Sequence, residues 1–359
     1  MNYRQLFQNT YAGKKVFVTG HTGFKGLWLI SWLHLLGAKV KGYALAPAQN
    51  DELYPLMKGQ ELCDSVISDI RDEVSLKREI SQFEPDFIFH LAAQSLVRVS
   101  YVLPAETFDI NVRGTLHVLE ALKSLDKPCT VIIITTDKVY LNRETDYAYS
   151  EDDALGGYDP YSASKAAAEI VVSSYRHSFF NNADQTRHKK NIATARAGNV
   201  IGGGDRAKDR IVPDIVRAME KNEPIIVRNP VSTRPWQHVL EPLSGYLLLG
   251  AKLKDNINLA GAWNFGPDEK DVRTVEDLVK IALKSWGKGS YEIAKLKEQP
   301  HEAGQLKLNI SKAKQQLDWQ PRLDSGKAIS LAIDWYKHAS PAYREYTFKQ
   351  IAAYESMET

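Results

Sequence analysis

The chain has 359 residues, of which 43% are hydrophobic and 25% are charged, as is ordinary for a globular protein with a buried core. The formal net charge of +2 speaks against binding to nucleic acid or to an anionic membrane. Two distant cysteines exclude a disulfide framework, no His, Cys, Asp and Glu residues have metal-ligand spacing, and no apolar run approaches the roughly 18 residues of a membrane span. With no signal-peptide pattern, we expect a cytoplasmic protein without a metal.

A glycine-rich turn joins the first expected strand to the first expected helix. The strand covers residues 15–19, the turn runs from Gly20 to Gly26 with the sequence GHTGFKG, and an apolar helix follows as far as Leu36. Gly20 permits a tight turn, Gly23 lets the backbone approach a pyrophosphate, and Gly26 allows close packing of the helix. Free N–H groups at the start of the helix favour phosphate. This order of strand, turn and helix predicts a dinucleotide site.

Three further strands are expected at residues 39–45, 65–70 and 86–90. The usual acidic residue for the adenosine ribose does not follow the first of these, so the pattern leaves open the choice between NAD and NADP. Asp69, near the end of the 65–70 strand, is placed either to meet an adenine amino group or to cap the next helix. The small residues that follow the 86–90 strand let a cofactor lie against the backbone.

A long helix is expected at residues 104–125, beginning with a proline. Asn111 within it is either a satisfied core amide or a brace for the catalytic loop. The alternation of strands and helices predicts a parallel sheet with helices on both faces, which is a Rossmann-type doubly wound α/β fold. We place a dinucleotide-binding domain at residues 10–198 and a smaller C-terminal substrate-binding lobe, partly interleaved with the first, at 199–345.

A buried strand that ends in polar residues provides the first part of a candidate catalytic site. The apolar run at residues 131–134 leads into Thr135-Thr136-Asp137-Lys138, at the edge of the sheet where ligands bind. After a polar loop, Tyr161 and Lys165 stand at i, i+4 spacing in a helix expected at residues 161–177. Residues at this spacing share one face of a helix, so both side chains can face the same cleft as the strand end.

These residues suit removal of a proton from a hydroxyl while its carbon gives up hydride. A tyrosine has a pKa near ~10, and lowering it to about 7 requires roughly 4 kcal/mol. The Lys165 ammonium at ~5 Å supplies roughly 3 kcal/mol at an effective dielectric of ~20, and a positively charged nicotinamide could supply the rest. Thr136 can hold the substrate oxygen by a hydrogen bond. A tyrosine and a lysine at this spacing are by themselves more often surface residues, but the dinucleotide turn favours the catalytic interpretation.

The second half of the chain changes character after a strand expected at residues 191–196. The glycine run at 197–205 lacks the strand and helix of a second nucleotide site, so we expect a flexible loop that exposes its backbone. Arginines follow among apolar residues, and because a guanidinium can bind two phosphate oxygens, they suggest a pocket for a phosphorylated or nucleotide ligand. The residues of this group are Asn199, Arg210, Arg228, Arg234, Trp236 and His238. Further helices are expected at 272–286, 311–317 and 328–337.

The glycine turn together with Tyr161-x-x-x-Lys165 resembles the extended short-chain dehydrogenases/reductases that modify nucleotide sugars. Within that family, Thr135-Thr136-Asp137 resembles the nucleotide-sugar 4,6-dehydratases. The likeness covers about residues 10–340. Later motifs are similar to the branch of the family that acts on CDP-glucose: residues 197–205, Asp209-Arg210, Arg228-Asn229-Pro230, Arg234-Pro235-Trp236-Gln237-His238-Val239 and Pro300-His301-Glu302-Ala303.

The resemblance implies a lyase with tightly bound NAD that converts CDP-glucose to CDP-4-keto-6-deoxyglucose and water, a step in deoxysugar biosynthesis of the O-antigen type. Tyr161 takes the proton of the 4-hydroxyl as hydride leaves C4, water is lost across C5 and C6, and hydride returns to C6. The cofactor contacts expected by position are Gly20, Thr22, Gly23, Phe24, Lys25, Gly26, Asp69, Ile70, Leu91, Ala92, Ala93, Gln94, Asn111, Tyr161 and Lys165. The expected substrate contacts are Ser95, Asn199, Arg210, Arg234 (at the pyrophosphate), Trp236 and His301.

One pair of residues departs from the pattern of the family. Many 4,6-dehydratases carry Asp-Glu after the threonine, where Asp protonates the leaving 6-hydroxyl and Glu removes the C5 proton. Here the pair is Asp137-Lys138. We expect Asp137 to be the acid. Lys138 is either neutral and a base, if it is desolvated near other cations, or charged and a stabiliser of the enolate.

The resemblance further implies a homodimer with a four-helix interface formed by helices 104–125 and 161–177, and internal packing alone is the alternative. Two other functions stay open: an epimerase or dehydratase of another nucleotide sugar, and a nucleotide-binding regulator without turnover. The Asp137-Lys138 pair speaks against a plain 4-epimerase, which needs no acid at O6. The complete set of Thr136, Tyr161 and Lys165 speaks against a regulator.

Overall fold

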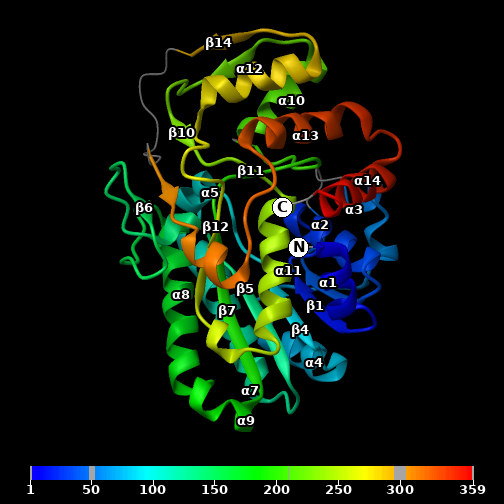
Figure 1. Cartoon of the computed structure of the whole chain (residues 1–359), viewed down its shortest axis with the longest axis vertical. Coiled ribbons are helices and arrows are strands. Elements are labelled where there is room, and N and C mark those ends of the chain that lie inside the picture. The colour runs from blue at the N-terminus through cyan, green and yellow to red at the C-terminus, as the bar shows by residue number, and fades with distance from the viewer. Residues whose placement is uncertain (1, 48–52, 209, 295–304, 358–359) are drawn as a thin grey trace.

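A parallel sheet of seven strands, in the order β3-β2-β1-β4-β5-β7-β12, forms the centre of the molecule (Figure 1). The structure is a computed structural model that describes residues 2–47, 53–208, 210–294 and 305–357. The strand order reverses between β1 and β4, and such a switch point places a crevice at the carboxyl ends of the strands. The predicted doubly wound α/β class is confirmed. The strands are β1 (Lys15–Thr19), β2 (Lys39–Ala44), β3 (Asp64–Ile67), β4 (Phe87–His90), β5 (Cys129–Ile134), β7 (Lys190–Ala197) and β12 (Ala262–Phe265).

Alternating residues of the central strands face two separate cores. Val16 and Val18 of β1 point into one core and Phe17 into the other, because successive residues of a strand face opposite sides. The first core is covered by α1 (Tyr3–Tyr11), α2 (Phe24–Leu35) and α11 (Leu240–Leu253). The second core is covered by α4 (Glu73–Phe83), α7 (Gly114–Lys123) and α8 (Pro160–Ser178). All residues of β5 are buried, as expected for a strand that is covered on both faces.

A smaller lobe, at the top of Figure 1, lies next to the carboxyl ends of the strands. It contains α10 (Ile211–Lys221), α12 (Val275–Trp286), α13 (Ser325–His338) and the paired strands β9 (Ile225–Val227) with β14 (Tyr291–Ile293) and β10 (Thr233–Arg234) with β13 (Arg273–Thr274). By contrast, α11 and β12, which come from the same half of the chain, pack on the main sheet. Within the described ranges, no helix is both long and apolar enough to cross a membrane. The other elements are α3 (Leu53–Leu56), α5 (Val97–Val102), α6 (Pro104–Phe108), β6 (Ala148–Tyr149), α9 (Gln185–His188), β8 (Val200–Ile201), β11 (Gln237–His238), β15 (Lys307–Leu308) and α14 (Tyr343–Glu355).

The predicted helix at residues 104–125 has an irregular middle. Between α6 and α7 the chain forms a π-helical segment, Asp109–Arg113, which contains the buried Asn111. Such segments are rare in proteins and are frequent at functional sites. The strand predicted at 65–70 ends earlier, at Ile67, so Asp69 lies in the loop that follows β3.

The glycine run at residues 197–205 is not the flexible loop that the sequence predicted. Residues 201–205 are buried. A Cβ at Gly203 would lie 2.0 Å from the ring of Trp335. The indole N–H of Trp28 donates a hydrogen bond to the carbonyl oxygen of Gly203 at 2.9 Å. The glycines therefore permit tight packing of aromatic side chains from both halves of the chain, and this role depends on tertiary contacts that a local pattern does not contain.

A buried carboxylate ties α11 to the C-terminal part of the chain. Glu241 accepts hydrogen bonds from the backbone N–H groups of Arg322 and Leu323 at 3.0 and 2.8 Å and from the Tyr354 hydroxyl at 2.8 Å. Burial raises the pKa of this carboxyl from 4.5 to about 7. The pKa of Glu241 is higher in the folded protein than in the unfolded chain. The free energy of unfolding therefore decreases as pH rises from the pKa of the unfolded chain to the pKa of the folded protein.

We expect Glu241→Gln to stabilise the protein above neutral pH and to leave its stability nearly unchanged at acidic pH. The amide oxygen can accept from both backbone N–H groups, and the amide nitrogen can donate to the Tyr354 hydroxyl. At about 1.4 kcal/mol per pKa unit, the gain in the free energy of unfolding is about 1–3 kcal/mol at about pH 8. Thermal unfolding of both proteins at about pH 5 and about pH 8 measures this gain, and an equal difference at the two pH values would contradict the prediction.

Candidate active site

A cleft of about 1010 Å³ lies at the carboxyl ends of β1, β4, β5 and β7, between the sheet and the smaller lobe. Its volume is at the upper end of the roughly 300–1,000 Å³ that is usual for ligand pockets. The structure brings most of the predicted site residues together in its lining. From the first half of the chain these are Gly20, Thr22, Gly23, Phe24, Lys25, Gly26, Asp69, Ile70, Leu91, Ala92, Ala93, Ser95, Thr136, Asp137, Lys138, Tyr161 and Lys165. From the second half they are Asn199, Arg210, Arg234 and Trp236.

The glycine turn at the floor of the cleft is shaped to receive a phosphate group. Gly20 has a φ of 78°, a conformation that glycine adopts readily. A Cβ at Gly26 would lie 2.0 Å from the carbonyl oxygen of Gly20, so only glycine fits there. α2 begins at Phe24, and none of the described side chains caps its N-terminus by a hydrogen bond. The first N–H groups of α2 are therefore available at the cleft, and they fit the pyrophosphate of a dinucleotide.

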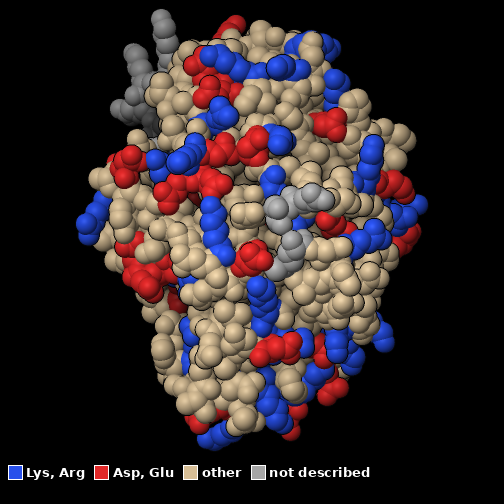
Figure 2. All heavy atoms as spheres, in the orientation of Figure 1, with Lys and Arg blue, Asp and Glu red and all other residues tan. Residues whose placement is uncertain are grey.

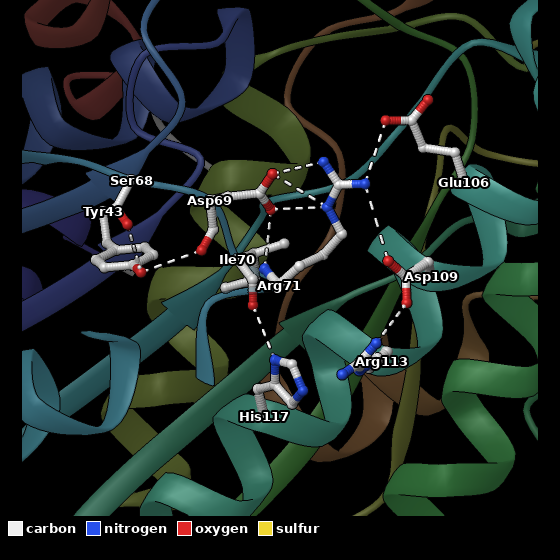
Figure 3. Close-up of polar contacts among 9 residues, drawn as sticks. All are labelled: Tyr43, Ser68, Asp69, Ile70, Arg71, Glu106, Asp109, Arg113 and His117. Carbon is white, nitrogen blue, oxygen red and sulfur yellow. Dashed lines mark hydrogen bonds and ion pairs between the residues drawn. The ribbon is translucent and has the colours of Figure 1, made fainter. Parts of the chain in front are cut away.

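The loop after β3 holds Asp69 as a carboxylate (Figure 3). Nη2 of Arg71 lies 2.6 Å from Oδ2 of Asp69, and hydrogen bonds from this guanidinium hold the pKa of Asp69 below its ordinary value. Arg71 also donates to Glu106 at 3.2 Å, and the Tyr43 hydroxyl donates to the backbone oxygen of Asp69 at 3.1 Å. Asp72 caps α4, which removes the alternative role of Asp69 as a helix cap. Asp69 thus lies at the cleft as a carboxylate that is held in place by Arg71, and contact with an adenine amino group stays a prediction.

Gln94 and Asn111 lie outside the lining of the cleft. The Asn111 side chain accepts a hydrogen bond from the Gln94 backbone N–H at 2.9 Å, and it donates to the Gln94 backbone oxygen at 3.0 Å and to Ser164 Oγ at 2.8 Å. The side chain of Gln94 is hydrogen-bonded to Leu96 and Thr107. Asn111 is thus a buried amide with hydrogen-bond partners, which agrees with the interpretation as a satisfied core amide, and it joins the loop after β4 to α8. Direct contact with a cofactor stays a prediction for both residues.

Thr136, Tyr161 and Lys165 meet at the end of β5. The Asp159 side chain caps α8, and the helix places Tyr161 and Lys165 on the face predicted for them, where both line the cleft. Thr136 lines the cleft together with Tyr161, and its side chain opposes the effect of burial on the pKa of Tyr161. The Lys165 ammonium donates to the backbone oxygen of Ile134 at 3.2 Å. This arrangement can hold a substrate hydroxyl between Thr136 and Tyr161.

The pKa of Tyr161 is not lowered in the way that the sequence predicted. Burial is the largest effect and raises the pKa of Tyr161 to about 12, against smaller lowering effects of Thr136 and Arg210. Burial also lowers the pKa of Lys165 to about 8, so its ammonium loses the proton just above neutral pH. Helical spacing predicted the pairing of the two residues, but it does not contain the depth at which they are buried. The protein alone therefore does not make Tyr161 a base at neutral pH, and a bound cation has to contribute.

Asp137 is the buried carboxyl of the site. The residue is 1% exposed, and its Oδ1 accepts a hydrogen bond from Thr136 at 3.0 Å. Oδ2 has no hydrogen-bond partner among the described residues and lies beside Gly198, where a Cβ would be 3.0 Å away. Burial raises the pKa of Asp137 in spite of the opposing charge of Lys138. A buried carboxyl with one free oxygen at the cleft is suited to give up a proton.

Positive charge surrounds this carboxyl. Burial and, to a smaller extent, the charges of Arg210 and Lys165 lower the pKa of Lys25 to about 7, whereas Asp137 opposes them. Arg210 forms an ion pair with Asp205 at 3.0 Å and donates to Ser95 at 3.2 Å. Cations held in a cleft with low-dielectric walls attract an anionic ligand. The site therefore fits a ligand that carries a pyrophosphate.

Some contributions to the site were not predicted from the sequence. Arg71 and Asp205 orient Asp69 and Arg210, and the only signal for such pairing is opposite charge two or five residues away in the chain. The start of α10 also lines the cleft, and so does Arg228, which the sequence predicted as part of the pocket for a phosphorylated ligand. His301, a predicted substrate contact, lies outside the described residues. In the part of the chain that the structure describes, no cluster of three or more His, Cys, Asp and Glu residues could hold a metal ion.

The fold and the site define a Rossmann-type protein of the short-chain dehydrogenase/reductase class, with a dinucleotide turn after β1, a threonine after β5, and a tyrosine and a lysine on α8. Residues 17–330 match the model of the family described as GDP-mannose 4,6 dehydratase, and the chain belongs to this family.

Individual relatives carry related activities. A CDP-glucose 4,6-dehydratase of Salmonella typhimurium is 48% identical to the chain over 331 residues, which are 92% of each protein. A CDP-paratose 2-epimerase of Salmonella typhi is 26% identical over 347 residues, 89% of this chain and 98% of the relative. The chain is also similar to the crystal structure of DesIV, a dTDP-glucose 4,6-dehydratase of Streptomyces venezuelae with NAD bound. The TM-score is 0.76 at 21% sequence identity, and the match covers 92% of this chain and 99% of the DesIV chain. This likeness shows a shared fold.

Proposed function

We propose that this protein is a CDP-glucose 4,6-dehydratase that converts CDP-glucose to CDP-4-keto-6-deoxyglucose and water. The observation that carries the proposal is the meeting, in one cleft, of a dinucleotide turn, the Thr136–Tyr161 pair and the buried acid Asp137. The turn and the pair suit oxidation at a sugar hydroxyl, and the acid suits loss of a second hydroxyl. The Salmonella relative, 48% identical over 92% of its length, supports CDP-glucose as the substrate.

The residues around the glycine turn fit NAD, which when bound accepts hydride from C4 of the sugar and returns it to C6. The N-terminus of α2 would bind its pyrophosphate, and the Asp69 carboxylate would accept a hydrogen bond from the adenine amino group. Arg234 and Arg210, on the lobe side of the cleft, would bind the pyrophosphate of the sugar nucleotide.

The chain's own residues move the protons of the reaction. Tyr161 accepts the proton of the 4-hydroxyl, and Thr136 holds the same oxygen in place. Once C4 is a ketone, the proton on C5 becomes acidic, and it passes to a base at the cleft, which is Lys138 if its amine is neutral, while negative charge develops on the ketone oxygen. A proton returns to C5 when hydride returns to C6. Asp137 gives its proton to the 6-hydroxyl, which leaves as water. The surrounding ammonium groups stabilise the negative charge, because they are fixed in a site that excludes much of the water.

We expect Lys138→Ala to slow the loss of water roughly 10²-fold or more and to slow the preceding reduction of nicotinamide much less. Lys138 lines the cleft beside Asp137, and as a base or as an enolate stabiliser it acts only after C4 is oxidised. Single-turnover absorbance of the reduced nicotinamide, compared with the mass of the quenched sugar, separates the two steps. Lys138→Arg keeps the charge but is not a base, so recovery in this variant would assign the role to charge. Equal losses in both steps would contradict the prediction.

Incubation of the purified protein with CDP-glucose, with and without added NAD, tests the proposed function by mass spectrometry. The expected product is lighter than CDP-glucose by one water, with no net formation of reduced cofactor. Loss of water from another nucleotide sugar but not from CDP-glucose would keep the reaction and correct the substrate. An isomer of unchanged mass would indicate an epimerase, and binding of NAD without turnover of any sugar nucleotide would indicate a regulator.

A homodimer through α6, α7 and α8 is part of the proposal, and a cytoplasmic location stays a prediction of the sequence. Large exposed apolar side chains lie on α8 and on the helices beside it, which suits burial against a partner. These residues are Tyr101, Val102, Phe108, Ile170 and Phe179. Sedimentation equilibrium would show twice the chain mass of 40.4 kDa, and Ile170→Lys should shift it to the single chain.

A further inference from the structure

A buried carboxylate lies one helical turn from the proposed catalytic lysine. Glu169 follows Lys165 by four residues on α8, so the two side chains share one face of the helix. Glu169 accepts hydrogen bonds from Thr135 Oγ1 at 2.6 Å, from Thr194 Oγ1 at 2.7 Å, and from Nε and Nη2 of Arg196 at 3.0 and 3.1 Å. The side chains of Glu169 and Arg196 are each 4% exposed. These donors fill the acceptor capacity of the carboxylate, so the side chain is held in one position.

We propose that Glu169 is a positioning residue for the reaction: it fixes α8 against β5 and β7, and it supplies the counter-charge that keeps Lys165 an ammonium. The inference rests on the proposed function for the role of Lys165, and it adds a residue that does not line the catalytic cleft.

The positioning part of the proposal follows from what the carboxylate connects. Thr135 directly precedes Thr136 at the end of β5, whereas Thr194 and Arg196 belong to β7. Arg196 in turn donates to the Tyr140 hydroxyl at 2.9 Å. One side chain of α8 thus holds two neighbouring strands of the sheet. The placement of the helix relative to the threonine at the end of β5 depends on this contact.

The counter-charge part follows from the surroundings of Lys165. Burial lowers the pKa of Lys165 to about 8, and Glu169 is the charge that opposes this effect. The hydrogen-bond acceptor of the ammonium, the backbone oxygen of Ile134, carries no formal charge. His90 is neutral, since burial lowers its pKa to about 3. Among the described residues, Lys25 from α2, His90 from β4 and Glu169 interact electrostatically with Lys165. Asp137 and Tyr161 line the same cleft, and Arg196 from β7 is paired with Glu169.

The remaining neighbours do not replace Glu169 as a counter-charge. Lys25 repels the ammonium of Lys165. Burial raises the pKa of Asp137 and the pKa of Tyr161, which disfavours the charged form of each, and Glu169 is the carboxylate that raises the pKa of Lys165. Arg196 is bound to the carboxylate itself and has the same sign as Lys165. Without the charge of Glu169, we therefore expect Lys165 to lose its proton at a lower pH, below the range in which it can support a phenolate at Tyr161.

Three variants separate the charge of Glu169 from its structural contacts. Glu169→Gln keeps the size of the side chain and removes the charge. Because this change leaves the buried guanidinium of Arg196 without its partner, the double variant Glu169→Gln/Arg196→Gln removes both charges and guards against failure to fold. Thr194→Val is the matched control, since it removes one hydrogen bond to Glu169 and keeps every charge.

The pH dependence of Lys165 acetylation by acetic anhydride, read by peptide mass spectrometry, tests the proposal on the ligand-free protein. Only the neutral amine reacts, so the midpoint reports the pKa of Lys165. We expect a midpoint of about 8 in the wild type and in Thr194→Val. In Glu169→Gln it should be lower by about one pH unit or more, and in the double variant it should be lower by less, because the repulsion by Arg196 is removed as well. An unchanged midpoint in both Glu169 variants would overturn the proposal.

Single-turnover reduction of nicotinamide by CDP-glucose provides the second measurement. In both Glu169 variants the rate should be lower by an amount that grows with pH between about pH 6 and about pH 8, as the ammonium is lost. If the rate is lowered by the same factor at every pH, Glu169 has only a structural role, and the proposal that it is the counter-charge of Lys165 is wrong. Acetylation needs neither NAD nor sugar, so it tests the role of Glu169 separately from the proposed function. If the acetylation midpoint shifts as expected but CDP-glucose does not react, the proposed function is rejected and the effect of Glu169 on Lys165 stands.

Discussion

Tyr161→Phe is expected to lower the turnover of CDP-glucose by roughly 10²–10⁴-fold, while the protein still folds and binds NAD. Tyr161 lines the cleft together with Thr136, where its hydroxyl can take the proton of the 4-hydroxyl. Phenylalanine keeps the ring, and the residue is only 9% exposed, so the packing at the start of α8 is preserved. Without a proton acceptor the 4-hydroxyl cannot become a ketone, and every later step is blocked.

The formation of reduced nicotinamide in a single turnover measures the step that Tyr161 controls. Tyr158→Phe is a matched control, because Tyr158 precedes α8 in the same loop but is 79% exposed. The control should react like the wild type. Rapid reduction of nicotinamide in Tyr161→Phe would mean that a different group accepts the proton.

The parts of the structure that depend on neighbours in the chain were predictable from the sequence. The glycine turn was predictable because only glycine combines the φ of Gly20 with the close approach at Gly26. The spacing of Tyr161 and Lys165 defined one helix face because α-helical geometry is regular. The buried run of β5 marked a strand covered on both faces, and the polar residues after it marked the edge of the sheet at which ligands bind.

Properties that depend on tertiary burial were not predictable in the same way. Lys165 was expected to lower the pKa of Tyr161, but both groups are buried deeply enough that desolvation dominates their charges. The glycines at 201–205 looked flexible because their packing partner, Trp335, lies more than a hundred residues away in the chain. The strand β12 was hidden in the half assigned to the smaller lobe, since a four-residue strand has too little periodicity to be distinguished from a loop.

Asp137→Asn is expected to stop the reaction one step later than Tyr161→Phe does. Asp137 lines the cleft, its Oδ2 has no hydrogen-bond partner among the described residues, and burial raises the pKa of the carboxyl, so this group can protonate the leaving 6-hydroxyl. Asparagine has nearly the same shape but no acidic proton. Oxidation at C4 should continue, reduced nicotinamide should accumulate on the enzyme, and loss of water should fall roughly 10²–10⁴-fold.

The pH dependence of the wild type provides a second test of this assignment. A group that acts as an acid is active below its pKa, and its contribution is lost as pH rises through that value. Burial raises the pKa of Asp137 from its ordinary value of 3.8. The rate of water loss should therefore fall as pH rises, and the fall should come at a higher pH than it would for an exposed aspartic acid. The decline should be absent in Asp137→Asn. If Asp137→Asn released product at the wild-type rate, the acid would be another group. Accumulation of reduced nicotinamide in Asp137→Asn, but not in Tyr161→Phe, would show that Asp137 acts after oxidation at C4 and Tyr161 acts during it.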